Sequence, residues 1–246
     1  MRRKISLLLS ILVFVLTIGN AQNYQYSYIL VDSVYEPSSS SEMSLYIDSL
    51  KQIFQQEMDQ VIGITDVPLQ VKTPQSELSN LLTDIVFEVG NNISLQEVGV
   101  PIDMSLLNFG GIRDHLIAQG NITVGDIYII SPFENTLVIV SLQGTELKKM
   151  FEKFTPSANQ PYSNAQVIYQ GGKIASVTVN GKAIENEQIY RIATLNFIAD
   201  GGDNILTGLD IDQIYPTGKV FRDIIINFIK GKKQISPRLD DRIMIQ

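Results

Sequence analysis

The segment whose residue types best suit binding chemistry is Asn108–Arg113, with the sequence Asn-Phe-Gly-Gly-Ile-Arg. It follows a mostly apolar run, residues 102–107, that is typical of a buried strand. The two glycines allow a close approach of backbone to a ligand, because glycine has no Cβ and tolerates positive φ angles. Arg113 carries a fork of five donors that suits a phosphate or a carboxylate. A tight turn with a solvated arginine explains the same residues, so this segment alone leaves both interpretations open.

Two further loops have the same design, because each follows an apolar segment and carries an aromatic residue or a glycine pair. They are Pro132-Phe133 and the stretch from Asn196-Phe197 to Gly201-Gly202-Asp203. Two phenylalanine rings beside polar loops can clamp a flat ring, and stacking contributes about 1–3 kcal/mol per base. Asp203 can accept hydrogen bonds from ribose hydroxyls, and Arg113 can bind a phosphate. Phenylalanine at a strand end is also common in cores, and Gly-Gly-Asp is common in plain turns.

The composition excludes several kinds of site. The 246 residues include one histidine, His115, and no cysteine, which excludes disulfides, thiolate metal sites and a lipidated cysteine. A zinc or binuclear centre draws on several His, Cys and carboxylate ligands that this chain does not supply. The formal net charge of −7 argues against binding to a nucleic-acid polymer. We expect His115 to be a surface residue without a role in the site.

The first residues have the pattern of an export signal. Arg2-Arg3-Lys4 form a basic start, residues 5–18 an apolar core, and Gly19-Asn20-Ala21 a small-residue cleavage site. This pattern predicts a signal peptide at 1–21, and its apolar run is shorter than the roughly 20 residues of a membrane span. We therefore expect a periplasmic or secreted protein with no integral membrane span.

Hydrophobic periodicity and turn residues predict helices interleaved with strands and hairpins. Three main helices are expected between cap residues: Ser39 and Gly63, Thr73-Pro74 and Gly90, and Thr217 and Gly231. Shorter helices are expected after Thr123 and over residues 144–154, and strands over 29–34, 67–71, 136–142, 165–169, 173–179 and 189–195. The fold class is therefore mixed α/β (α+β), with partly antiparallel sheets and covering helices. Asn180-Gly181 favours a type I′ hairpin turn.

Six motifs occur in one order along the chain. They are Leu78–Asp84, Asn108–Arg113, Gly120–Thr123, Pro132–Asn135, Leu142–Leu147, and Tyr190–Ala193 leading into Asn196–Asp203. In these motifs the chain resembles the C-terminal domain of the 5′-nucleotidase (UDP-sugar hydrolase) family. The resemblance implies a 5′-nucleotidase C-terminal-like domain over residues 66–246, preceded by an N-terminal strand and a linker-type helix over residues 22–65.

The resemblance also implies roles for five residues. In two-domain members of this family the C-terminal domain grips the nucleoside part of the substrate. Phe133 and Phe197 would sandwich the base, and Asp203 would bind the ribose hydroxyls. Arg113 would lie near the phosphate, and Asn108 would support the base or the sugar.

The sequence departs from the family pattern at two places. No arginine occurs between residues 22 and 112, so Pro74-Gln75 stand near the position of a substrate-facing arginine, and Ser79 replaces a glycine. Residues 22–65 do not resemble the metallophosphoesterase domain that precedes this domain in the family. With one histidine, the chain cannot rebuild that domain's two-metal centre.

The expected function is therefore a secreted nucleotide- or nucleoside-binding domain of a split 5′-nucleotidase. A separate metallophosphoesterase chain would supply the divalent metals and the hydrolysis, so no cofactor and no catalysis are expected from this chain alone. The alternative is a non-catalytic envelope scaffold or interaction module that retains the fold without the ligand. A third interpretation is an enzyme that acts alone.

Overall fold

The structure is a computed structural model, and it describes residues 27–28 and 42–246. The predicted signal peptide, the predicted strand at 29–34 and the Ser39 cap lie outside the described residues. Residues 50–246 form one compact unit, which contains every described strand and the candidate site. No helix in the described part of the chain combines the length and the hydropathy needed to cross a membrane.

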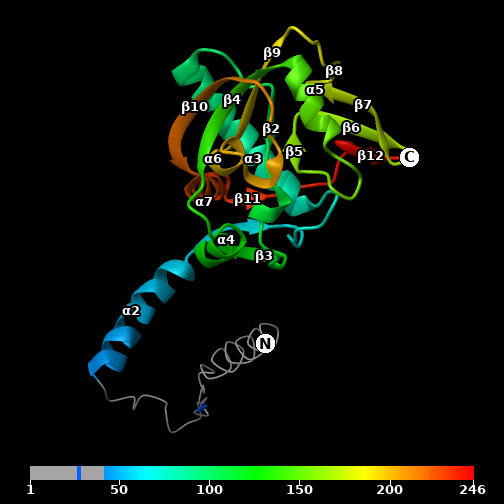
Figure 1. The fold of residues 1–246 in the computed structure, drawn as a ribbon. Helices are drawn as coiled ribbons and strands as arrows, with labels where there is room; N and C mark the ends of the chain where they lie inside the picture. The colour runs from blue at the N-terminus through cyan, green and yellow to red at the C-terminus, as the bar shows by residue number, and fades with distance from the viewer. Residues whose placement is uncertain (1–26, 29–41) are drawn as a thin grey trace, which may run out of the picture. The chain divides into compact units, whose positions relative to one another are not determined.

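Helices are interleaved with strands along the chain, with five strands in succession over residues 162–195 (Figure 1). The helices are α2 (Glu42–Met58), α3 (Glu77–Ile93), α4 (Val124–Ile130), α5 (Gly144–Glu152), α6 (Asn196–Ala199) and α7 (Phe221–Lys232), with short turns η2 (Ser94–Val98), η3 (Phe109–Gly111) and η4 (Gly202–Asn204). The strands are β1 (Val61–Thr65), β2 (Met104–Leu106), β3 (Gly120–Thr123), β4 (Thr136–Gln143), β5 (Tyr162–Ser163), β6 (Ala165–Gln170), β7 (Lys173–Val179), β8 (Lys182–Ala183), β9 (Ile189–Leu195), β10 (Ile211–Val220), β11 (Gln234–Ile235) and β12 (Ile243–Ile245).

The strands form three mixed sheets, in the orders β10-β4-β9-β2-β5, β11-β1-β3 and β12-β6-β7-β8. In the five-stranded sheet, β2 pairs with β9 in parallel, and the other neighbours are antiparallel. Each smaller sheet likewise contains one parallel pair, β1 with β11 and β6 with β12. The expected mixed α/β class with partly antiparallel sheets is thus confirmed.

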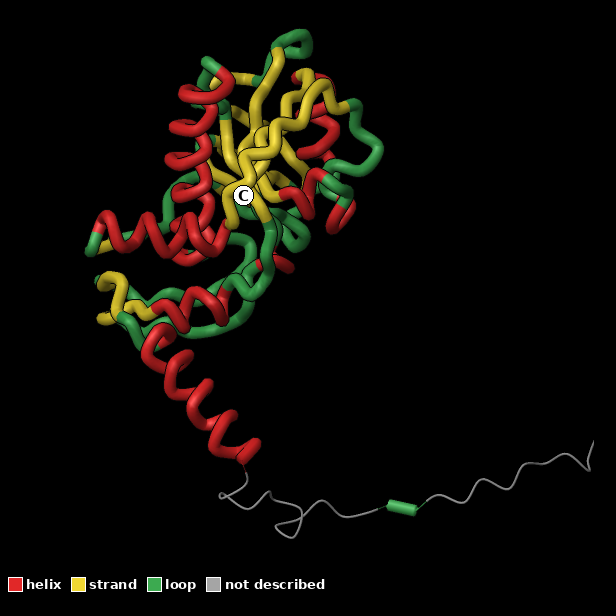
Figure 2. The backbone as a smooth tube through the Cα atoms, turned by 90° about the vertical axis from the view of Figure 1, so that its left-hand side faces the viewer, coloured by secondary structure: helices red, strands yellow, loops and turns green. Residues whose placement is uncertain are grey.

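The five-stranded sheet separates two hydrophobic cores, because side chains of a strand point alternately to its two faces. From β4, Leu137 and Ile139 join one core with α3 and α7. Val138 and Val140 join the other core with α5 and the sheet that contains β6 and β7. Figure 2 shows helices on both sides of the strands. Burial on both faces explains why β4 reads as a continuous apolar run.

All three glycines expected to end helices lie inside elements, and two of them pack closely against a neighbouring element. The first helix ends at Met58, and Gly63 lies within β1, where an added Cβ would stand 2.6 Å from Cγ2 of Ile229 in α7. Gly90 lies within α3, where a Cβ would stand 2.7 Å from Cβ of Ala193 in β9. Both predicted boundaries are wrong because these glycines permit close packing between elements.

The second helix also begins later than predicted. Thr73-Pro74 lies before it, and the cap is Ser76, whose Oγ accepts a hydrogen bond from Ser79 N at 3.1 Å. Ser79 Oγ accepts in return from Ser76 N at 2.9 Å, so the two serines form a capping box. Ser79, which departs from the family's glycine, therefore belongs to a helix cap.

The last helix begins four residues after its predicted cap. Thr217 lies in β10, where its Oγ1 donates to the Leu137 carbonyl at 2.8 Å, and α7 begins at Phe221. Gly231 lies within α7, which ends at Lys232. The prediction misses β10 because that strand is determined by antiparallel pairing with β4, a contact distant in sequence.

Candidate functional site

The glycine loop after β2 forms one wall of a pocket. Asn108 precedes the turn η3, whose backbone bonds run from Gly111 N to Asn108 O (3.1 Å) and from Ile112 N to Phe109 O (3.0 Å). A Cβ added at Gly111 would stand 2.7 Å from Oδ1 of Asn108, so this position requires glycine. A Cβ at Gly110 would stand 3.1 Å from Oδ2 of Asp203. The glycine pair thus permits a close approach, here to two polar side chains of the pocket.

Asn108 joins this loop to the loop that carries Asp203. Its Nδ2 donates to Oδ2 of Asp203 at 2.6 Å, across 95 residues of sequence. Asn108 is 2% exposed, and its Oδ1 is buried without a hydrogen-bond partner among the described residues. Asp203 has φ 53° and ψ 15°, a left-handed conformation that Asp and Asn tolerate better than most residues. This conformation directs the carboxylate to the glycine loop instead of continuing the helical turn.

Arg113 lies at the far end of the glycine loop. Its backbone N donates to the Ile130 carbonyl of α4 at 2.9 Å, which places the loop beside the connection from α4 to β4. Its guanidinium carbon lies 4.7 Å from the centroid of the Phe133 ring, within the range of a cation–π contact. Arg113 is exposed, as the simpler interpretation of a turn with a solvated arginine expects, but its guanidinium also contacts the Phe133 ring.

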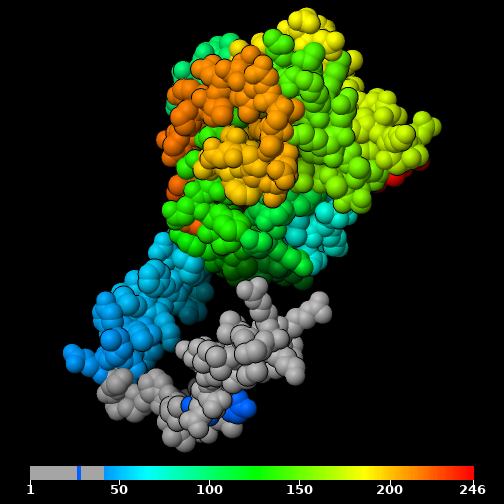
Figure 3. Space-filling view, viewed as in Figure 1, coloured from blue at the N-terminus to red at the C-terminus, as the bar shows by residue number. Residues whose placement is uncertain are grey.

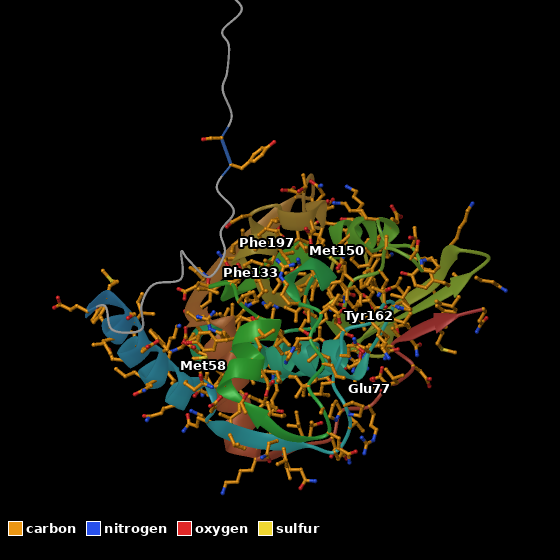
Figure 4. All side chains as sticks on the ribbon, turned by 90° about the horizontal axis from the view of Figure 1, so that it is seen from below. Met58, Glu77, Phe133, Met150, Tyr162 and Phe197 are labelled. Carbon is orange, nitrogen blue, oxygen red and sulfur yellow. The ribbon has the colours of Figure 1, made fainter. Side chains whose placement is uncertain are left out.

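Phe133 and Phe197 are exposed rings that line the same pocket. They are 38% and 41% exposed, respectively, so neither ring is turned into a core. Phe197 belongs to α6, and its ring rests on Gly202, where an added Cβ would lie 2.3 Å from Cε1 of Phe197. Thr136 N donates to Oδ1 of Asn196 at 2.8 Å and ties the two ring-bearing segments together. Figure 4 shows Phe133 and Phe197 next to each other when the molecule is viewed from below.

Together these residues enclose a pocket of about 270 Å³. It is lined by Asn108, Gly110, Gly111, Arg113, Phe133, Asn135, Phe197 and Asp203. All five residues named from the sequence are therefore brought together, although they come from three separate loops. Asn135 had no assigned role, although the motif Pro132–Asn135 contained it. In Figure 3 the yellow-orange surface of residues near 200 adjoins the green surface of residues near 130.

The pocket offers three kinds of contact to a ligand. Two aromatic faces suit a flat, weakly polar ring, and the Asp203 carboxylate suits hydroxyl donors. Arg113 is the one cation among the described lining residues, and it suits an anionic group. The volume lies close to the lower end of small-molecule pockets, about 300–1,000 Å³.

A larger hollow of about 440 Å³ lies elsewhere, around Arg242, Asp240 and Ser163. The Arg242 guanidinium already donates to Asp240, to Oδ2 of Asp84 and to the Tyr162 carbonyl. Its charge is therefore satisfied within the protein, and no aromatic ring lines the hollow in the described part of the chain. Among the described residues, no group of three or more His, Asp or Glu side chains is placed to hold a metal ion.

His115, expected to be a surface residue without a role in the site, does not line the pocket, and it is partly buried where it pairs with Asp126. Its Nε2 lies 3.2 Å from Oδ1 of Asp126, in the first turn of α4. Asp126 also accepts from N and Oγ1 of Thr123 at 2.8 and 2.7 Å, which completes a capping box at the start of the short helix expected after Thr123. Burial raises the pKa of Asp126, but the hydrogen bonds from Thr123 and His115 outweigh it, so this pKa lies below its ordinary value of 3.8.

We expect Asp126 to contribute stability that is lost in acid. Because its pKa is lower in the folded than in the unfolded chain, the contribution is present above pH 3.8 and disappears as pH falls through the folded value. Asp126→Asn should therefore flatten the acid limb of the curve of unfolding free energy against pH, as measured by urea unfolding. Asp241→Asn, at an exposed position, should leave that limb parallel to wild type. An equal or steeper limb in Asp126→Asn would contradict the prediction.

Comparison with known proteins gives consistent matches. A family model described as "5′-nucleotidase, C-terminal domain" matches residues 60–210, more than half of the chain. Protein UshA of Yersinia enterocolitica is 30% identical over 133 residues, which cover 52% of this chain and 24% of UshA. The trifunctional nucleotide phosphoesterase protein YfkN of Bacillus subtilis is 26% identical over 230 residues, which cover 84% of this chain and 15% of YfkN.

Solved structures share the fold as well. The crystal structure of a 5′-nucleotidase precursor from Thermus thermophilus has a TM-score of 0.67 and 25% sequence identity. The match covers 82% of this chain and 43% of that chain. The chain therefore spans less than half the length of each of these relatives.

Proposed function

Because this chain belongs to the 5′-nucleotidase C-terminal domain family, we propose that its pocket binds the nucleoside part of a nucleotide. The observation that carries the proposal is the convergence of two half-exposed rings and the Asn108–Asp203 pair on one pocket of about 270 Å³. Phe133 and Phe197 stack on the base, and Asp203 accepts hydrogen bonds from the ribose hydroxyls. Arg113 binds the phosphate, and Asn108 orients Asp203.

The phosphate contact is the weaker part of this assignment. Arg113 is the one cation among the described lining residues, and it already lies over the Phe133 ring. Gln75, near the position of the family's upstream arginine, donates to Asp240 at 3.0 Å and does not line the pocket. We therefore expect the base and the ribose to supply most of the affinity, with adenosine and AMP binding within about tenfold of each other.

The binding test uses isothermal titration calorimetry of the purified protein with adenosine, AMP and a UDP-sugar. Asp203→Asn should weaken adenosine binding by about tenfold or more, because hydrogen bonds to a charged group contribute about 1.5–3 kcal/mol. Asparagine tolerates the left-handed backbone at position 203, so the substitution removes charge with little added strain. Asp241→Asn, at an exposed position outside this pocket, is the matched control. Absence of heat with all three ligands would favour the scaffold interpretation instead.

The hydrolytic half of the proposal concerns a second chain. We propose that a separate metallophosphoesterase supplies the divalent metals and cleaves the phosphate ester, as part of nucleotide breakdown. One observation supports it: the chain has one histidine and no cysteine, which is too few ligands for a two-metal centre. The test is to recover such a partner with the tagged protein and to assay AMP hydrolysis by each chain and by both. Hydrolysis by this chain alone, with added divalent metal, would contradict the proposal.

We further propose export to the periplasm or outside the cell, from the basic start, apolar core and small-residue site of residues 1–21. Mass spectrometry of the protein purified from its own cells should find an N-terminus at Gln22. A protein that retains its first residues would contradict the cleavage.

A further inference from the structure

Arg222 is a buried cation on the far side of the loop that carries Phe133. It lies in the first turn of α7, is 7% exposed, and does not line the pocket. Its Nη1 donates to the Pro132 carbonyl at 3.2 Å, and its Nη2 donates to Oε1 of Glu134 at 3.0 Å. The two acceptors belong to the residues immediately before and after Phe133. The Arg222 guanidinium thus binds the residue on each side of Phe133.

Two further contacts hold this loop in place. The Arg222 guanidinium carbon lies 4.1 Å from the centroid of the Tyr128 ring, in the helix α4 that precedes the loop. The backbone N of Phe221 donates to the Asn135 carbonyl at 2.8 Å. The start of α7 therefore contacts the loop and the helix before it, through a side chain and through the backbone.

Stability alone does not account for an arginine at this position. A buried charge loses its hydration, and this loss is recovered only with well-formed, fully paired partners. The partners of Arg222 are one carbonyl, one ring and a carboxylate whose side chain is 81% exposed, and Arg222 Nε has no partner among the described residues. A positive charge in the first turn of a helix is also disfavoured by the helix dipole. An apolar residue would suit the same space better if only packing mattered.

We infer that Arg222 is a positioning residue, whose guanidinium fixes the Pro132–Glu134 loop so that the Phe133 ring faces Phe197 across the pocket. This inference rests on the proposed nucleoside-binding function. Arg222 acts through Phe133 and touches no ligand. The geometry requires a fork of several donors, because one group has to reach a carbonyl and a carboxylate while it lies over the Tyr128 ring.

The experiment is a double-mutant cycle with adenosine as the titrant. Arg222→Gln should weaken adenosine binding by about fivefold or more, in line with coupling between residues of one network. In a Phe133→Ala background the same substitution should change the affinity by less than about twofold, because the ring that it positions is absent. An equal loss of adenosine affinity on Arg222→Gln in the Phe133→Ala background would overturn the inference. It would show that Arg222 affects binding by a route other than Phe133.

Two variants separate positioning from general destabilisation. Arg238→Gln removes an exposed guanidinium that pairs with Asp66 away from the pocket, and it should leave adenosine binding unchanged. Arg222→Lys keeps the charge but loses the fork, so it should bind more weakly than wild type and can replace Arg222→Gln if that variant does not fold. Wild-type affinity in both Arg222 variants would overturn the inference.

Crystal structures of the free wild type and of Arg222→Lys give a second readout that needs no ligand. The expected result is a Phe133 ring that has shifted or adopts more than one position, with Phe197 unchanged. If wild type binds neither adenosine nor AMP, the proposed function fails, and these structures alone decide whether Arg222 places Phe133. An unchanged Phe133 ring would overturn the inference whatever the ligand.

Discussion

Phe197→Ala is expected to weaken adenosine binding by about 5- to 150-fold, since stacking contributes about 1–3 kcal/mol per base and 1.4 kcal/mol corresponds to a factor of ten. The ring is 41% exposed, so the free energy of unfolding should change by about 1 kcal/mol or less. The effect should therefore appear in titration calorimetry with adenosine and hardly at all in urea unfolding. Phe133→Ala should behave in the same way, because its ring lines the same pocket.

The matched control is Phe54→Ala, which removes an exposed ring from α2. It should bind adenosine as wild type does, because Phe54 does not line the pocket. Equal affinity in Phe197→Ala and Phe54→Ala would rule out a stacked base. A large loss of stability in Phe197→Ala would instead show that the ring belongs to the core.

Gly144→Ala is expected to destabilise the protein by about 1–3 kcal/mol or more, as overpacking does. A Cβ at this position would stand 1.9 Å from the carbonyl oxygen of Glu185 and 3.1 Å from Cε2 of Tyr190. The nearest atom is backbone, so relief requires the chain to move. Better helix propensity of alanine offsets only about 1 kcal/mol. Urea denaturation should show a lower midpoint with an unchanged slope.

Gly231→Ala tests the same substitution where space is free. An added Cβ in this position of α7 would meet no atom within 4 Å, and its φ angle is not in the positive region. The variant should therefore be more stable than wild type by about 0.4–1 kcal/mol, because alanine lowers the entropy of the unfolded chain. If Gly144→Ala and Gly231→Ala changed the free energy of unfolding in the same direction, this account would be contradicted.

Elements that depend on local chemistry could be predicted from the sequence. The Thr123–Asp126 capping box is present, because its bonds join residues three apart. The hairpin of β6 and β7 is present. The Asn180-Gly181 turn that follows has φ angles of 51° and 70°, as a type I′ turn requires. The strand expected over residues 136–142 is present as β4.

Elements that depend on distant partners differ from the prediction. Gly63 and Gly90 resemble helix stops in sequence, yet each is set by a neighbour far along the chain, Ile229 and Ala193. Strand β10 is not predicted because its partner is β4. Local propensity carries no information about such contacts, so a cap residue and a packing glycine look alike.

The candidate site also combines features that the sequence predicts with contacts that only the fold creates. The sequence by itself predicted which residues come together: Asn108, Arg113, Phe133, Phe197 and Asp203 all line one pocket. Only the tertiary structure decided how they meet, with Asn108 bonded to Asp203 across 95 residues and Arg113 lying over Phe133. It alone revealed Arg222, whose buried guanidinium lies 88 residues from Glu134 in sequence. The residue type determines whether a side chain can donate a hydrogen bond or stack on a ring. Which partner it contacts depends on packing between residues that are distant in sequence.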